Sequence, residues 1–239
     1  MKNVIITLLA SVAAVAMFSC KKGVTGSGPL VTENRQIQAS FNEIALEAAA
    51  TVYYTTAAEK SVKIVAQQNV LNVLETFVSG SKLVIKFKGD IDYRSSDDIK
   101  VYVTAPSVYN FVSATAGDIN VTNKVDNNTI YLRTDGAGSI SIAEAKANSM
   151  EIFANGSGSI TINDGTSGSG KARTIGSGSI DISNLTMGYM EAKTVGSGNI
   201  RTKVSDHLDA RIEGSGSIYY KGSPSISSHV SGNGRLIRL

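Results

Sequence analysis

The chain has 239 residues, a net charge of +3 and 18% charged residues, and its 42% hydrophobic content is sufficient to build a packed core. This combination of hydrophobic content, charged content and low net charge excludes an intrinsically disordered chain and a membrane-spanning bundle. The scattered charges give no support for a nucleic-acid partner. With 6% aromatic residues and no Trp, the core must consist mainly of Ile, Val, Leu and Ala.

An apolar run at the N-terminus indicates export. Lys2 precedes the run from Val4 to Phe18, which at about 1.5 Å per residue is too short for a hydrocarbon core of about 30 Å. Residues 1–19 are therefore predicted to be a signal peptide. The sequence at 17–20 resembles a bacterial lipoprotein box, which implies that Cys20 carries the lipid that holds the protein on a membrane. An ordinary signal peptide followed by an incidental Cys is the alternative.

The segment after Cys20 is predicted to be a tether. Residues 20–29 are rich in Gly, Ser, Thr and Lys, a composition typical of a flexible linker that here would carry the lipid. Some Gram-negative bacteria display lipoproteins with acidic residues just after the Cys, and Lys21-Lys22-Gly23 has none. We therefore expect an outer-membrane lipoprotein that faces the periplasm.

Residues 30–112 are predicted to form a β-rich N-terminal part that caps the remainder of the chain. Gly80-Ser81 and Gly89-Asp90 supply turns between its strands. A short helical turn is expected over Asn69–Glu75, with Val70, Leu71 and Leu74 on one side. The predicted strands are Thr51–Thr55, Ser61–Ala66, Lys82–Lys88 and Ile99–Thr104.

One phrase, Gly-x-Gly-Ser-Ile or a close variant, recurs at intervals of 18–21 residues in the rest of the chain. A fixed period of this length is typical of a solenoid or another repeated supersecondary unit. The copies begin at Thr115, Gly136, Gly156, Gly176, Gly196, Gly214 and Gly232.

The residues around each phrase indicate strands. Ile alternates with polar residues after the phrase, as at Ile160 and Ile162, and a second alternation precedes it, as at Met190 and Ala192. Stacked coils would place an Ile ladder on one wall and small Ala and Thr residues on the other. The sequence predicts an all-β fold, a single-stranded right-handed parallel β-helix-like solenoid over 113–239, continuous with 30–112. Gly is expected at the corners because sharp bends often need a positive φ.

Several phrases taken in order resemble a known family. They are Phe41-Asn-Glu-Ile44, Leu83-Val-Ile-Lys86, the strand Ile99–Pro106 and the serial Gly-Ser-Gly-Ser-Ile copies. Together they resemble the head GIN domain of "putative auto-transporter adhesins", which also has a domain-of-unknown-function label. The resemblance covers roughly Phe41–Leu239 and implies a β-helix-like fold. It also implies secretion in Bacteroidota-type bacteria, often as a lipoprotein; adhesion in the family name is itself a prediction.

Stacking the repeats predicts a basic column on one outward face. The position three residues before each glycine pair reads Arg133, Phe153, Arg173, Lys193, Arg211 and His229. Its cations Arg133, Arg173, Lys193 and Arg211 form a candidate surface for an anionic polymer such as lipopolysaccharide or an acidic glycan. The alternative is a face neutralised by the neighbouring outward column of Tyr131, Glu151, Lys171, Glu191, Asp209 and Ser227.

Catalytic and metal motifs are missing from the sequence. No Gly-x-Ser-x-Gly elbow occurs, and His207 and His229 are expected at the surface without metal-ligand partners at useful spacing. The Gly-x-Gly phrase lacks the third Gly of a dinucleotide loop and the Lys of a P-loop, and Ser takes the place of the Asp of calcium-binding repeats. We therefore predict no catalytic residue, no metal and no cofactor.

These observations favour a non-enzymatic lipoprotein of the cell envelope, an adhesin or binding scaffold that presents solenoid faces to proteins or saccharides. One alternative is a glycan-active β-helix enzyme, which needs two carboxylates about 5–10 Å apart in one groove. Another is a structural or assembly protein that forms homo-oligomers. Unpaired strands at the ends of a solenoid associate readily, and the Arg235–Leu239 tail leaves apolar residues at one end.

Overall fold

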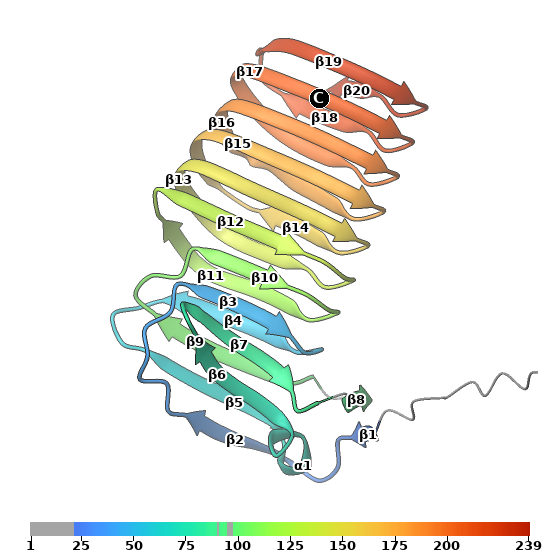
Figure 1. Ribbon diagram of the computed structural model, residues 1–239. Helices are drawn as coiled ribbons and strands as arrows, with labels where there is room; N and C mark the ends of the chain where they lie inside the picture. The colour runs from blue at the N-terminus through green and yellow to red at the C-terminus, as the bar shows by residue number, and fades with distance from the viewer. Residues whose placement is uncertain (1–21, 90, 95–97) are drawn as a thin grey trace, which may run out of the picture.

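The computed structural model describes residues 22–89, 91–94 and 98–239, and it confirms the predicted β-solenoid (Figure 1). The signal peptide and Cys20 lie outside the described residues. The N-terminal elements are β1 (Lys22–Thr25), β2 (Leu30–Arg35), β3 (Glu43–Glu47), β4 (Thr51–Thr56), β5 (Ser61–Gln67), α1 (Gln68–Leu71), β6 (Leu74–Ser79), β7 (Lys82–Phe87), β8 (Ile91–Arg94) and β9 (Lys100–Ala105). The coils follow as β10 (Asn110–Ser113), β11 (Asp118–Asp126), β12 (Thr129–Thr134), β13 (Ile140–Gly156), β14 (Ser159–Ile162), β15 (Gly165–Gly176), β16 (Ser179–Gly196), β17 (Ile200–Gly214), β18 (Ile218–Lys221), β19 (Ser225–Gly232) and β20 (Leu236–Arg238).

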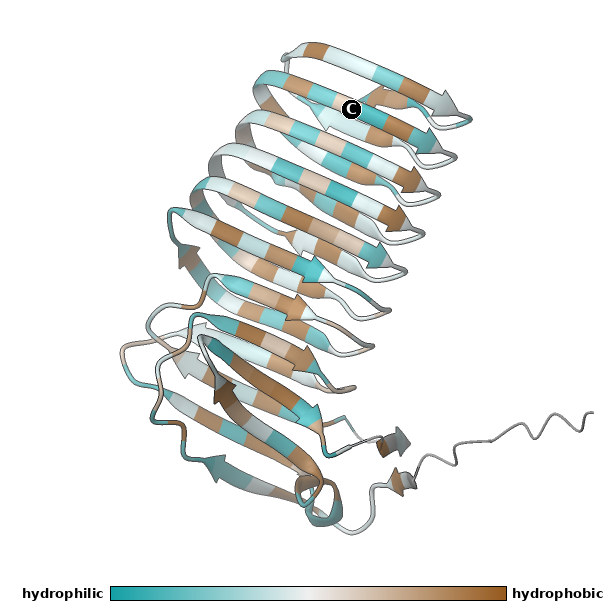
Figure 2. Cartoon of the chain, in the orientation of Figure 1, coloured by the Kyte–Doolittle hydropathy of each residue, from teal (hydrophilic) through white to brown (hydrophobic). Residues whose placement is uncertain are grey.

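Each coil contributes one strand to each of two long parallel walls, and short parallel segments between the walls pair separately, as Lys124–Asp126 does with Glu144–Lys146. The isoleucine wall contains β11, β14, β18 and β20 and the first parts of β13, β16 and β17. The charged wall contains β12, β15 and β19 and the last parts of β13, β16 and β17. Hydrophobic and hydrophilic residues alternate along the strands of both walls (Figure 2). One set of side chains therefore fills the space between the walls while the other faces outward.

The core has the predicted ladder. In the isoleucine wall one column of inward Ile residues stacks in register from one coil to the next, and all six are 1% exposed or less. In the middle coils small residues such as Ala172, Thr174 and Ala192 face them from the charged wall, which keeps the core narrow there, whereas larger residues such as Leu132 and Ile152 take these positions nearer the cap. The ladder consists of Ile119, Ile140, Ile160, Ile180, Ile200 and Ile218.

Both glycines of a corner lie too close to the preceding coil to carry a Cβ. The first also has the positive φ that the sequence predicts in the corners from Gly156 onward, as at Gly176 (φ 102°) and Gly196 (φ 110°), but not at Gly136. The second lies so close to the coil below that a Cβ on Gly178 would overlap the carbonyl oxygen of Gly158. Polar residues after the corners link neighbouring coils: the Asn199 side-chain oxygen accepts a hydrogen bond from the Ser217 amide at 2.8 Å.

The N-terminal part is a cap built on the same sheet. Its β3 and β4 pair in parallel with β10 and β11 of the coils, so strand pairing continues across the expected boundary at 112. At the far end β2 and β5 pair antiparallel, as do β5 and β9, which ends the parallel stack.

One segment of the cap and one segment of the preceding tether differ from expectation. The helical turn expected over Asn69–Glu75 is the single turn α1, because Leu74 already begins β6, which pairs antiparallel with β7. Val70, Leu71 and Leu74 are nevertheless all buried. In the expected flexible tether, the structure has β1 paired with β8, and the Asn69 side-chain amide donates to the Thr25 carbonyl at 2.8 Å. Within the described residues, no helix is long and apolar enough to cross a membrane.

Candidate functional site

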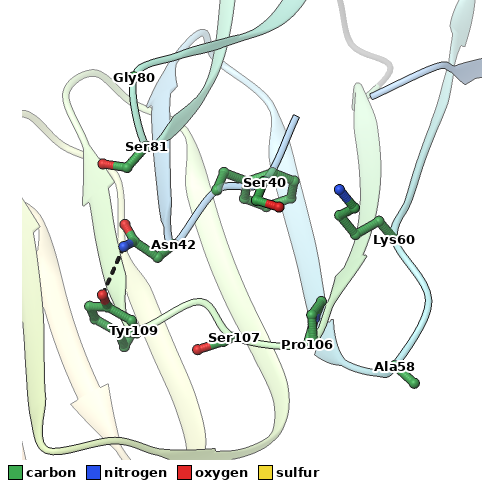
Figure 3. Close-up of a pocket in the computed structure, with 10 residues that line it drawn as sticks. Ser40, Asn42, Ala58, Lys60, Gly80, Ser81, Pro106, Ser107 and Tyr109 are labelled. Atoms are coloured by element: carbon green, nitrogen blue, oxygen red, sulfur yellow. Dashed lines mark hydrogen bonds between the residues drawn. The ribbon is translucent and has the colours of Figure 1, made fainter. Parts of the chain in front are cut away.

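A pocket of about 480 Å³, here called the junction pocket, lies where the cap meets the coils (Figure 3). Four loops supply its lining: the segment before β3, the loop after β4, the turn between β6 and β7, and the loop between β9 and β10. Its volume lies within the range of about 300–1,000 Å³ found for small-molecule sites. The lining residues are Ser40, Phe41, Asn42, Ala58, Lys60, Gly80, Ser81, Pro106, Ser107 and Tyr109.

Backbone hydrogen bonds centred on Asn42 bring three of these loops together. The Asn42 amide donates to the Ser81 carbonyl at 3.0 Å, which fixes the turn before β7. The Asn42 carbonyl accepts from the amides of Tyr109 and Asn110 at 3.1 and 3.2 Å, which fixes the loop before β10. The pocket is thus anchored to three adjacent parallel strands, so its wall is held by the sheet itself.

The polar groups of the junction pocket are mostly free to meet a ligand. The Asn42 side-chain amide donates to the Tyr109 hydroxyl at 2.7 Å, and the Tyr109 O–H has no acceptor among the described residues. The hydroxyls of Ser40, Ser81 and Ser107 likewise have no side-chain hydrogen bond in the described part of the chain. The Lys60 ammonium donates to the carbonyls of residues 38 and 39, at 2.6 and 3.3 Å. The pocket therefore presents four available hydroxyls, one cation and no carboxylate.

The basic column is placed on the charged wall in the predicted register. Its members stack from β12 through β13, β15, β16 and β17 to β19. Phe153 interrupts the cations and packs against Tyr131 at 5.7 Å between ring centroids. The coils therefore align the column, but an aromatic contact separates Arg133 from Arg173.

Three of the four column cations have carboxylate partners. Arg133 Nε donates to both carboxylate oxygens of Asp135 at 2.8 Å, and Arg211 pairs with Asp209 at 2.8 Å. The third pair joins Lys193 Nζ to Glu213 Oε1 at 2.5 Å, and this hydrogen bond lowers the pKa of Glu213. Asp209 belongs to the neutralising column named from the sequence, but Asp135 and Glu213 lie in the next outward column and were missed. Their spacing of two residues from the column on the same strand face is the signal that could have found them.

Arg173 is the exception in the column. It forms no ion pair with any described residue and its Nε is buried without a hydrogen-bond partner, although its charge contributes to lowering the pKa of Glu213. Its neighbours in register are Phe153 and Lys193, and neither side chain can accept a hydrogen bond from the guanidinium.

A second hollow, here called the face depression, lies on the same face beside Arg133 and has a volume of about 360 Å³. It arises because the basic column continues into the cap as the short side chains of Val112, Ala45 and Val84. Its rim contains three carboxylates, of which Asp135 pairs with Arg133 and Glu43 pairs with Lys82 at 2.8 Å. The hydrogen bond from Lys82 to Glu43 raises the pKa of Lys82. The rim carboxylates are Glu43, Glu47 and Asp135.

Neither histidine lies in a functional cluster. His229 is exposed on β19, and His207 is within 2.9 Å of the Ser225 hydroxyl through its Nδ1. In the described ranges, no group of three or more His, Cys, Asp and Glu residues could hold a metal ion.

The fold defines a β-solenoid protein with an N-terminal β cap. Residues 40–224 match the family described as "Putative auto-transporter adhesin, head GIN domain", and the chain belongs to this family. The resemblance seen in the sequence is thereby confirmed. No match is found among curated proteins.

Solved structures from Bacteroides and Parabacteroides share this fold. A "putative adhesin" from Bacteroides fragilis is 24% identical with a TM-score of 0.85, covering 91% of this chain and 100% of that chain. Two proteins from Parabacteroides distasonis, a "putative lipid binding protein" and a "putative adhesin", are each 22% identical, with TM-scores of 0.80 and 0.75. Each of these also covers 91% of this chain and 100% of its own. At these identities the likeness establishes the fold alone.

Proposed function

We propose that this chain is a non-enzymatic binding protein of the bacterial cell envelope that holds a saccharide unit in the junction pocket. The observation that carries the proposal is the set of four available hydroxyls that line this pocket, on Ser40, Ser81, Ser107 and Tyr109. The family description and the names of the structural neighbours support a binding role at the cell surface or envelope.

The chemistry of the pocket fits a sugar better than other small molecules. Each hydroxyl both donates and accepts hydrogen bonds, as each sugar hydroxyl does, so the two sets can pair in either sense. Pro106, which is exposed, supplies apolar surface against which the carbon face of a sugar ring can pack, and Phe41, only 7% exposed, lies behind it as part of the core. Because the lining contains no carboxylate, it lacks the acid and base that glycoside hydrolysis requires.

The envelope location rests on the sequence at the N-terminus. The signal peptide at 1–19 and lipidation at Cys20 would tether the cap end to a membrane. Strand β1 of the N-terminal part begins two residues after Cys20. A lipid on Cys20 would therefore hold the cap end of the molecule, where the junction pocket lies, at the membrane.

Titration calorimetry with a panel of neutral and acidic mono- and disaccharides tests the proposal. We expect at least one to bind, and Tyr109→Phe, which removes only the hydroxyl, to weaken that binding about tenfold, equivalent to about 1.4 kcal/mol. Tyr189→Phe is the matched control because Tyr189 is 60% exposed on a distant coil. If no sugar in the panel binds, or if Tyr109→Phe binds as well as wild type, the proposal is wrong. Cleavage of an oligosaccharide would instead support an enzyme and direct attention to the face depression.

A second candidate function is the binding of an anionic polymer along the basic column. Arg173 favours it, since among the described residues this guanidinium forms no ion pair with a carboxylate and its Nε has no hydrogen-bond partner. Arg133, Lys193 and Arg211 would have to exchange their present carboxylate partners for those of the polymer, so their contribution would be smaller.

A further inference from the structure

The last strand of the charged wall, β19, has an open edge. In the part of the chain that the structure describes, β17 is its only strand partner, so the backbone groups on its other edge face no strand. Ile226 and Val230 occupy inward positions stacked on buried residues of β17, yet they are 41% and 45% exposed. The narrow core is therefore uncovered at this end of the solenoid (Figure 1).

The residues of β19 do not hinder pairing with another strand. Exposed edge strands usually carry charges or Pro that prevent association. At the opposite end of the molecule, the edge strand β2 carries Glu33 and Arg35, which form an ion pair at 3.1 Å. On the charged wall, every strand from β12 to β17 has at least one charged residue, whereas β19 has no Lys, Arg, Asp, Glu or Pro. The strand that most needs such protection is thus the one without it.

The pattern of β19 is complementary to itself. An antiparallel pair about a two-fold axis at Ser228 places this residue opposite Ser228 of the second copy. Ile226 then faces Val230 of the second copy, so that inward apolar side chains meet. On the outer face, Ser227 lies opposite His229 of the second copy. A register shifted by one residue would instead oppose apolar and polar positions.

We propose that β19 pairs antiparallel with β19 of a second copy of this chain, joining two solenoids end to end about a two-fold axis at Ser228. The pairing would cover Ile226 and Val230 and satisfy the open backbone edge. A two-fold contact uses the same strand on both copies, so it closes at a dimer and does not propagate into a fibre. The charged edge of β2 disfavours the head-to-tail alternative.

Cysteine cross-linking of the full chain in the membranes of expressing cells tests the register. Opposite residues in an antiparallel pair have Cα atoms about 4.5–5.5 Å apart, within the reach of a disulfide. We expect Ser228→Cys to give a reducible dimer on oxidation. Ser227→Cys or His229→Cys alone should give little dimer, but the two together should give it efficiently. The wild-type chain, with Cys20 alone, is the blank.

Sedimentation velocity of the full chain in density-matched detergent tests the contact itself. We expect a dimer for wild type and a monomer for Ile226→Lys or Val230→Lys, with circular dichroism unchanged because both residues are already exposed. Leu30→Lys, which adds the same charge to β2 at an exposed position, should remain dimeric. A monomeric wild-type chain at micromolar concentration, or equal cross-linking at 227 and 228, would overturn the proposal.

Discussion

Gly178 lies directly over Gly158 in the stack of corners, so closely that a Cβ on Gly178 would overlap the carbonyl oxygen of Gly158. The Gly178 amide also donates to the Gly156 carbonyl at 2.8 Å, so the corner cannot move away without losing this bond. The second glycine of the repeat is therefore required by the distance between coils.

This relationship predicts the effect of Gly178→Ala. We expect a loss of about 3 kcal/mol of unfolding free energy, the upper end of the usual cost of overpacking, and a fall in Tm of roughly 10 °C. Thermal denaturation followed by circular dichroism measures it. Ser177→Ala in the same corner is the control, since Ser177 is exposed, and a similar loss in both variants would contradict the argument.

Tyr54 predicts a dependence of stability on alkaline pH. Its hydroxyl is buried, donates to the Ala105 carbonyl at 2.9 Å and accepts from the Val108 amide at 3.1 Å. Burial raises the pKa of Tyr54 above its ordinary value of 10.0. The folded state therefore favours the neutral phenol, and this contribution is complete below about pH 10 and is lost as the pH rises through the folded pKa.

The variant Tyr54→Phe removes this hydroxyl. It leaves the Ala105 carbonyl and the Val108 amide, both buried, without their hydrogen-bond partner. We expect it to lower the free energy of unfolding by about 1–3 kcal/mol at neutral pH. The difference from wild type should shrink above about pH 10, as measured by urea denaturation at several pH values. Tyr102→Phe serves as the control because Tyr102 is exposed, and a pH-independent difference for Tyr54→Phe would argue against this explanation.

The basic column is tested by the double variant Arg173→Glu with Lys193→Glu. If an acidic polymer lies along the column, its affinity should fall at least tenfold at low salt and the salt dependence should weaken, as measured with immobilised lipopolysaccharide and an acidic glycan. Lys100→Glu with Lys203→Glu makes the same change in charge at exposed positions away from the column. If Arg173→Glu with Lys193→Glu binds the acidic polymer as tightly as wild type does, the column is a neutralised surface and does not bind the polymer.

Location is tested by protease treatment of intact and lysed cells. Because no acidic residue follows Cys20 at positions 21–23, we expect protection until the cells are lysed. An antibody to the chain and a known periplasmic lipoprotein as a control provide the measurement. Digestion on intact cells would contradict the periplasmic orientation and strengthen a role in contact with other cells or extracellular glycans.

The sequence predicts the coils well because their structure is periodic. The alternation at Ile160 and Ile162 recurs in neighbouring copies, so both the inward direction and the stacking follow from one alignment. The need for the second glycine could not be predicted, since it depends on how closely Gly178 approaches the next coil. The spacing places Glu213 on the outward face of the column, but it does not determine that Lys193 reaches across to it on the next coil.

The junction pocket could not be predicted because the cap has no repeat. Its lining comes from loops around residues 40, 60, 80 and 107, and their proximity depends on parallel pairing of β7, β3 and β10. Individual strands of the cap follow from alternation, as in Ser61–Ala66, but their order in the sheet does not.

The regular stacking of the coils makes length an independently adjustable property of this molecule. Each coil adds one strand spacing of about 4.8 Å and repeats the pattern of both walls. Gain or loss of one repeat of 18–21 residues would therefore move β19 farther from or nearer to the cap in fixed increments. The junction pocket at one end and the open strand β19 at the other would both be preserved. A series of such variants would therefore vary the distance between these two features in steps of one coil.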